Sequence, residues 1–211
     1  MVRTTGFCLI ALAALHAVPV HAADEDTQLW LYLNTVVPVE TDLTATFELS
    51  PRFRENGDQL LARASLDHRM SDRLSLGGAV AYVEFASGHE FRLHQQAVVA
   101  LGPFAFRSRV EERWFAGADR PQIRLRQRVA ATVPITGTTK AVMGGEVSYV
   151  AQSEINGASA RVEQWRAQAA LQRKFSPHFD ASVGYLFIYS PRPGTADRIS
   201  HVPQLTLTVR P

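Results

Sequence analysis

Residues 179–189 read FDASVGYLFIY and decide the fold class. Every second residue of this segment is apolar or aromatic, and in its first half the residues between them are Asp180, Ser182 and Gly184. The apolar set is Phe179, Ala181, Val183, Tyr185, Phe187 and Tyr189. Because successive side chains of a β-strand point to opposite faces, this alternation predicts a strand with one apolar face.

The same period of two recurs along the chain and predicts eleven strands, most of them about a dozen residues long. The predicted strands are 27–37, 42–53, 59–70, 73–85, 90–101, 103–115, 121–134, 139–151, 160–174, 178–190 and 199–209. Strands of globular proteins usually have about five or six residues, whereas a tilted membrane strand needs about 9–11. The sequence therefore predicts an all-β fold, an antiparallel up-and-down transmembrane β-barrel of about 10–12 strands.

The connections between the predicted strands alternate in length. Short turns such as Ser71-Asp72 and Gly102-Pro103 alternate with longer polar loops such as 152–159 and 191–197. In outer-membrane barrels the short turns face the periplasm and the long loops face the outside. The ten strands from residue 42 to residue 209 begin and end on the short-turn side, which predicts an even count with both ends periplasmic.

Segment 27–37 breaks this parity. Three placements remain open for it: a partner strand at the seam, part of a larger closure, or a segment inserted into the mouth of the barrel.

The first 23 residues have the features of a secretory signal peptide. Arg3 supplies the positive start, residues 6–18 form an apolar run, and Val20-His21-Ala22 resembles a cleavage site after Ala22 or Ala23. The run is too short to cross a bilayer, which takes about 20 residues; an uncleaved anchor is the alternative. Residues 24–211 are then expected to form a single barrel domain, exported to the bacterial outer membrane, with the periplasm as the alternative location.

Composition excludes several classes of protein. Hydrophobic residues make up 46% of the chain and charged residues 20%, which excludes a helical membrane protein but suits a barrel with half-apolar strands. The formal net charge is +2 and no strongly basic segment stands out, so no nucleic-acid partner is expected. All but two of the 22 basic residues are arginine, the side chain best suited to pairing with carboxylates away from water.

Aromatic residues gather near both ends of the predicted strands. On the apolar faces next to the long loops they are Phe53, Phe91, Trp114, Tyr149 and Tyr189, and next to the short turns they are Phe104 and Phe179. Amphipathic rings favour the two membrane interfaces. This distribution favours a barrel with outer-membrane lipid around it.

If the apolar faces meet lipid, the polar faces line the lumen, meaning the interior of the barrel. The lumen-facing candidates are Arg63, Asp67, Arg92, His94, Arg107, Arg109, Glu111, Arg113, Arg124, Arg126, Arg128, Glu146 and Arg166. Two neighbouring strands carry arginine at every second position, and these cations would repel unless carboxylates such as Glu48, Asp67, Glu111 and Glu146 paired with them. Either an ion-pair network fills a narrow barrel, or the arginines line a passage for small anionic solutes.

Catalytic and metal-binding patterns are weak. His94 lies on a polar face, and Ser65, Ser75 and Ser108 are the serines most available as nucleophiles, but no compact motif joins a serine to a histidine. The sole cysteine, Cys8, lies within the signal, and no histidines are paired at metal-ligand spacing. No cofactor and no metal site are therefore expected, and no catalytic residue is assigned.

Several segments, taken in order, resemble the uncharacterised bacterial family known as domain of unknown function 2490. They are residues 27–30 (TQLW), 91–96 (FRLHQQ), 107–114 (RSRVEERW), 123–128 (IRLRQR) leading to 133–135 (VPI), and 201–205 (HVPQL). The resemblance covers most of the mature chain. It implies an exported outer-membrane barrel and no established activity. The chain departs from the common barrel pattern by ending in Val209-Arg210-Pro211 instead of an aromatic residue.

Four hypotheses for function follow. The first is a structural or scaffolding barrel of Gram-negative bacteria with a lumen filled by arginines and carboxylates. The second is a small anion-preferring channel or solute porin, and the third is an outer-membrane lipid-modifying enzyme. The fourth is a soluble periplasmic barrel with its faces inverted. The substrate or ion and the oligomeric state are left open.

Overall fold

The structure, a computed structural model, describes residues 23–211, so the predicted signal peptide lies outside the described residues except for Ala23. Eleven β-strands make up most of this region. They are β1 (Asp24–Pro38), β2 (Leu43–Arg54), β3 (Gln59–Arg69), β4 (Leu74–Phe85), β5 (Gly88–Leu101), β6 (Phe104–Phe115), β7 (Gln122–Pro134), β8 (Thr139–Gln152), β9 (Arg161–Ser176), β10 (Phe179–Ser190) and β11 (Arg198–Val209). Within residues 23–211 no helix is long and apolar enough to span a membrane.

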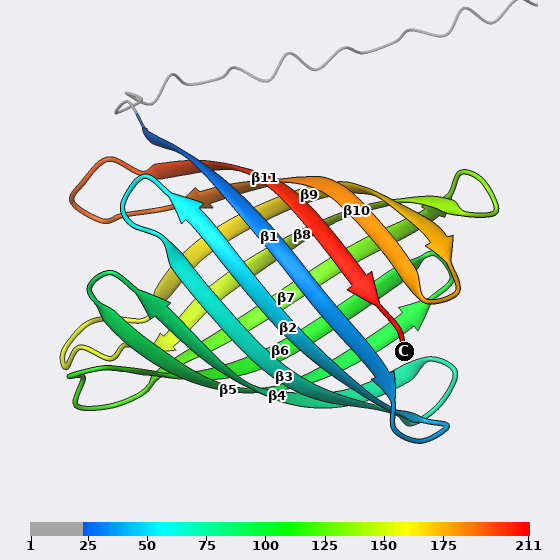
Figure 1. Ribbon diagram of the computed structural model, residues 1–211. Coiled ribbons are helices and arrows are strands. Elements are labelled where there is room, and N and C mark those ends of the chain that lie inside the picture. The colour runs from blue at the N-terminus through cyan, green and yellow to red at the C-terminus, as the bar shows by residue number, and fades with distance from the viewer. Residues whose placement is uncertain (1–22) are drawn as a thin grey trace, which may run out of the picture.

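The strands close into one barrel, as the sequence predicted (Figure 1). Each predicted strand matches an observed one to within three residues at either end. Consecutive strands are antiparallel neighbours from β1 to β11, so the chain rises and descends as a simple meander. The predicted all-β, up-and-down barrel is therefore confirmed.

The barrel closes through one parallel pair, between β1 and β11. In this pair Leu33 lies opposite Leu207, and Thr27 lies opposite His201. Segment 27–37 is thus a full strand at the seam, which settles the three alternatives left by the sequence. The prediction of an even count is wrong for the whole barrel, because β1 adds an eleventh strand to the ten that alternate regularly.

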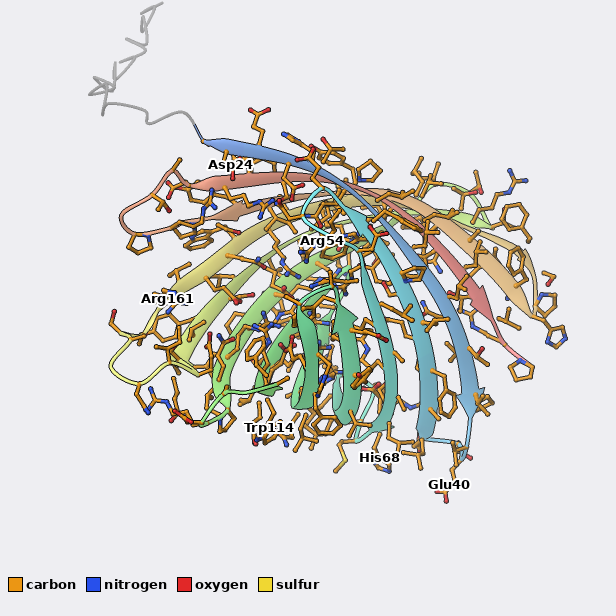
Figure 2. The ribbon with its side chains drawn as sticks, turned by 60° about the vertical axis from the view of Figure 1, so that its left-hand side comes forward. Asp24, Glu40, Arg54, His68, Trp114 and Arg161 are labelled. Carbon is orange, nitrogen blue, oxygen red and sulfur yellow. The ribbon has the colours of Figure 1, made fainter. Side chains whose placement is uncertain are left out.

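The odd count places the two ends of the barrel-forming chain at opposite rims. β1 begins beside β11 at Asp24, at the end of the barrel with the long loops, whereas β11 finishes at the end with the short turns (Figure 1). The expectation that both ends lie on the short-turn side is therefore wrong as well. Figure 2 shows the two rims, with Asp24 and Arg161 toward one end of the barrel and Glu40 and His68 toward the other.

The outer face of the barrel is apolar along most strands. Phe47 on β2 and Val183 on β10 have relative exposures of 54% and 59%, values that a core residue of a globular protein does not have. The aromatic residues expected near the two rims lie on this face. Gln95, Ser108 and Gln127 interrupt the apolar surface on β5, β6 and β7, and the Ser108 hydroxyl donates to Gln127 Oε1 at 2.7 Å.

Alternation places polar side chains inside, and one of three register shifts in the strand pairing, the one between β8 and β9, changes it locally. The pairing of β8 with β9 shifts between Ser148 and Tyr149, where Ser148 pairs with Gln164 but Tyr149 pairs with Val162. One residue of β9, Glu163, is therefore left over, and such an extra residue is re-aimed relative to its neighbours.

Candidate functional site in the barrel lumen

The lumen encloses a cavity of about 440 Å³. Its wall carries twelve arginines but only four glutamates. The arginines are Arg52, Arg54, Arg63, Arg92, Arg107, Arg109, Arg113, Arg124, Arg126, Arg128, Arg166 and Arg198, and the glutamates are Glu48, Glu111, Glu146 and Glu163. Of the thirteen residues predicted to face the lumen, all but Asp67 line this cavity.

Glu111 on β6 lies at the centre of the arginine ladders. Its carboxylate accepts hydrogen bonds from Arg124 and Arg126 on β7, the latter at 2.8 Å, and from Arg109 of its own strand at 3.3 Å. Only 2% of Glu111 is exposed. Because an ionised carboxylate is costly to bury without partners, the three guanidiniums are what make this position tolerable.

Glu146 on β8 forms a second centre next to the first. Arg107 donates to it at 2.6 Å, Arg126 donates through Nε at 3.0 Å, and the Arg166 guanidinium lies 3.5 Å away. Arg126 therefore bridges Glu111 and Glu146. The rigid fork of the guanidinium suits this role, because its N–H groups point in more than one direction within a plane.

Glu163 and Glu90 extend the network toward the rim with the long loops. Glu163 accepts from Arg124 at 2.8 Å and from Arg113 at 3.2 Å. Glu90 accepts from Arg113 at 3.0 Å and from Arg92 at 2.6 and 2.9 Å. Glu163 joins the site through the bulge of β9, so strict alternation, which places Gln164 and Arg166 inside, did not predict it.

The whole network holds seven arginines on four glutamates. The arginines are Arg92, Arg107, Arg109, Arg113, Arg124, Arg126 and Arg166, and the glutamates are Glu90, Glu111, Glu146 and Glu163. The ladders are thus paired but not neutralised, and a positive surplus remains on this side of the lumen.

Glu48 and Asp67 were both predicted to pair with arginines, and only Glu48 does so in the described chain. Glu48 pairs with Arg63 across β2 and β3, whereas the carboxylate of Asp67 accepts from the Gln96 amide at 2.7 Å and forms no ion pair in the described chain. Asp67 occupies space left by Gly77, where an added Cβ would lie 2.0 Å from its Oδ1. Gly77 therefore makes room for a charged side chain.

Three lumen arginines have no carboxylate partner among residues 23–211. The Arg52 guanidinium lies over the Trp30 ring, with Cζ 4.1 Å from the ring centroid. Arg128 donates to the amide oxygen of Gln168 at 3.2 Å. Arg54 and Arg52 each have a buried Nε without a hydrogen-bond partner in the described chain, as do Arg107 and Arg198. Such groups are costly unless water or an anion meets them.

An apolar cluster forms the opposite wall of the lumen. It consists of Trp30 on β1, Leu186 and Ile188 on β10 and Val202 on β11, with Tyr32 packed against it. Trp30 is held in place by a hydrogen bond from its Nε1 to Gln28 Oε1 at 2.7 Å. The interpretation that polar faces alone line the lumen therefore fails for β1, β10 and β11.

A chain of hydrogen bonds links the two walls. Arg128 on β7 donates to Gln168 on β9, whose amide donates to Gln204 Oε1 on β11 at 3.0 Å. The Gln204 amide in turn donates to the Tyr32 hydroxyl at 3.2 Å across the seam. These hydrogen bonds fix the position of Arg128 relative to the apolar cluster.

The seam has its own polar cluster near the rim with the long loops. Asp26, 2% exposed, accepts from Gln28 at 2.5 Å and from Ser200 at 3.2 Å, and it pairs with Arg198 at 3.1 Å. These contacts join β1 to β11 through side chains. They supplement a parallel ladder, which is slightly weaker per residue than an antiparallel one.

The structure does not bring Ser65 or Ser108, two of the candidate nucleophiles, within hydrogen-bond distance of His94, the candidate base. His94 is buried in the lumen, whereas Ser108 lies on the outer face, so the barrel wall separates them. The Ser65 hydroxyl donates to the backbone carbonyl of Thr46 at 3.4 Å. Among residues 23–211 no three His, Cys, Asp or Glu side chains are grouped closely enough to hold a metal ion.

Residues 27–199 match the family described as protein of unknown function, DUF2490. The chain belongs to this family. The match spans most of the barrel of this chain, from β1 to the start of β11. It confirms the family resemblance that the sequence segments indicated.

Two further comparisons add little to the DUF2490 assignment. No curated protein sequence matches the chain. One solved structure, from a study of how membrane proteins crystallise in meso, shares 15% identity over 78% of this chain and 71% of its own. The TM-score of the two structures is 0.42.

Proposed function

We propose that this DUF2490 barrel resides in the outer membrane of Gram-negative bacteria and passes small anionic solutes through its lumen. The predicted signal peptide supports export. The apolar outer face, with Phe53 and Trp114 near one rim and Phe104 near the other, suits a surrounding bilayer. With this orientation, acyl chains contact the outer face and the arginines lie inside.

The observation that carries the proposal is the surplus of arginine in the cavity wall. Seven arginines share four glutamates, and three more have no carboxylate partner in the described chain. Rings of arginine or lysine give pores a preference for anions. An ion-pair network whose only role was to fill the lumen would not need this excess of cations.

The paired arginines have a different role from the unpaired ones. Glu111 and Glu146 hold Arg109, Arg124 and Arg126 rigidly against the wall, which keeps the cavity from collapsing. Arg52, Arg54 and Arg128, which have no carboxylate partner in the described chain, are the cations left to attract a solute. The structural or scaffolding role is the competing hypothesis, in which the lumen passes nothing.

Conductance in planar bilayers separates the two hypotheses. With a gradient of KCl across the bilayer, the reversal potential of the purified wild-type protein should indicate a preference for chloride. The double variant Arg52→Glu/Arg128→Glu should move it toward the potassium potential. Arg173→Glu, the same change on the exposed outer face of β9, is the matched control and should leave selectivity unchanged.

Two outcomes count against the proposal. A folded protein without conductance would support the scaffold instead, and a selectivity that ignores Arg52 and Arg128 would remove the role assigned to the surplus charge. Membrane fractionation tests the location separately, since a mature protein that stays soluble without detergent would contradict the orientation of the two faces.

A further inference from the structure

The lumen has two chemically different walls that face one cavity. Strands β5 to β9 carry the arginine–glutamate network, whereas Trp30, Leu186 and Ile188 line the same cavity from β1 and β10. A route for chloride or phosphate alone would need only the charged wall. In sites for small organic molecules, apolar side chains bury the body of the ligand and placed polar groups fix its orientation.

Arg52 on β2 lines the cavity beside the apolar wall. Its guanidinium lies on the face of Trp30, and its Nε is buried without a hydrogen-bond partner among residues 23–211. Stacking on an aromatic ring occupies the face of a guanidinium and leaves the N–H groups at its edge free. Those N–H groups form a fork that matches the two oxygens of a carboxylate.

The position of Arg128, which also has no carboxylate partner among residues 23–211, is consistent with the same ligand. Arg128 is held by the hydrogen-bond chain that runs through Gln168 and Gln204 to Tyr32, beside the apolar cluster. The cavity volume of about 440 Å³ lies within the range of roughly 300–1,000 Å³ usual for small-molecule sites.

We infer that the lumen binds an organic carboxylate with a compact apolar body. The carboxylate lies on the Arg52 guanidinium, and the apolar body lies against Trp30, Leu186 and Ile188. The inference rests on the proposed function, because the ligand must enter the lumen, and it adds the chemical class of the solute. An inorganic anion would pair with Arg52 but would leave the apolar wall facing water.

Trp30 provides a direct measurement of binding. The chain has three tryptophans, and Trp114 and Trp165 lie on the outer face. The variant Trp114→Phe/Trp165→Phe therefore retains Trp30 as the sole tryptophan. Its fluorescence would be titrated in detergent, at constant ionic strength, with cyclohexanecarboxylate, acetate, phosphate and the neutral cyclohexylmethanol.

Cyclohexanecarboxylate should give a saturable change in Trp30 emission and bind at least about tenfold more tightly than acetate or phosphate, because it buries apolar surface as well. Cyclohexylmethanol, which lacks the charge, should bind at least about tenfold more weakly. In the same background, Arg52→Gln should weaken cyclohexanecarboxylate about tenfold, whereas Arg173→Gln on the outer face should change nothing.

Two more variants keep the test valid if Arg52→Gln does not fold, as judged by heat-modifiable gel mobility. Arg52→Lys keeps the charge but removes the fork, and it should also weaken cyclohexanecarboxylate. Leu186→Thr should weaken cyclohexanecarboxylate and leave acetate unchanged.

Equal binding of acetate and cyclohexanecarboxylate, or binding that ignores Arg52, would overturn the inference. Combined with the binding titration, the bilayer measurement distinguishes failure of the proposed ligand class from failure of the proposed passage. Anion selectivity without preference for the cyclohexyl compound would refute only the ligand class. Saturable binding without conductance would refute only the passage.

Discussion

Glu163 on β9 forms an ion pair with Arg124 on β7, with 2.8 Å between Oε2 and Nη1, although β8 lies between the two strands. The pair exists because the bulge opposite Ser148 turns Glu163 into the lumen. It links β7 to β9 across β8 without a contact between the two backbones.

Loss of charge at Glu111 should destabilise the barrel more than the same loss at Glu163. Glu111→Gln leaves Arg109 without a carboxylate partner and takes one of two partners from both Arg124 and Arg126, and removing one partner of a buried ion pair costs about 3–5 kcal/mol. Glu163→Gln should cost about 1–3 kcal/mol, because Arg113 keeps Glu90 and Arg124 keeps Glu111. Urea unfolding in detergent measures both; an equal cost would contradict the central position of Glu111.

Alanine should be tolerated at Gly145 but not at the adjacent Gly144. A Cβ at Gly144 would lie 2.6 Å from the Val129 carbonyl oxygen, whereas a Cβ at Gly145 would meet its nearest atom at 3.6 Å. Overpacking against backbone costs about 1–3 kcal/mol. Thermal unfolding should therefore show a lower Tm for Gly144→Ala only, and two equally stable variants would be inconsistent with the close approach of β7 and β8.

The parallel seam can be tested with a disulfide. Leu33 and Leu207 are opposite each other in the β1–β11 pair, and residues 23–211 contain no cysteine. Leu33→Cys/Leu207→Cys should form an intramolecular disulfide under mild oxidation, because paired strands hold Cα atoms within the reach of about 4.4–6.8 Å. Leu33→Cys/Val183→Cys is the control on the next strand. Equal cross-linking of both variants would contradict the seam.

Acid pH should loosen the loop that follows β8. Partial burial raises the pKa of Glu154, but hydrogen bonds from its own backbone N–H, Gln122 and Ser153 outweigh this and hold the pKa below its ordinary value. A lowered folded-state pKa stabilises the loop above the unfolded-state pKa of about 4.3, and this stabilisation is lost as pH falls through the folded-state value.

Hydrogen exchange of residues 153–160 checks this prediction. Protection should decrease as pH falls below about 4, after correction for the intrinsic exchange rate. Glu154→Gln should remove that pH dependence while the exchange of the β8 backbone stays constant. A wild-type loop with unchanged protection would refute the role of the carboxylate.

Period-two alternation was sufficient to predict the strands and the inward direction of residues such as Arg109 and Arg126, since each is set by the local geometry of one strand. Glu163 could not be found this way, because a bulge depends on the pairing of two strands. The apolar cluster was missed for another reason: alternation separates two faces but does not require that the inner one be polar, and Trp30 faces inward.

The seam required information that no single segment carries. The hydrophobic pattern of 27–37 predicts a strand, but its neighbour across the closure, β11, lies more than 170 residues further along the chain. Whether such a strand pairs with the last one depends on the curvature of all the strands between them.

Closure through β1 and β11 also has a consequence for the order of folding. Hairpins such as β10–β11 join neighbours in sequence and can form at once, whereas the seam joins the two most distant strands and carries the largest loop-closure entropy. We therefore expect the barrel to close only after the hairpins are in place. Until then β1 and β11 each expose a free edge, the stage at which a folding catalyst or another chain can bind.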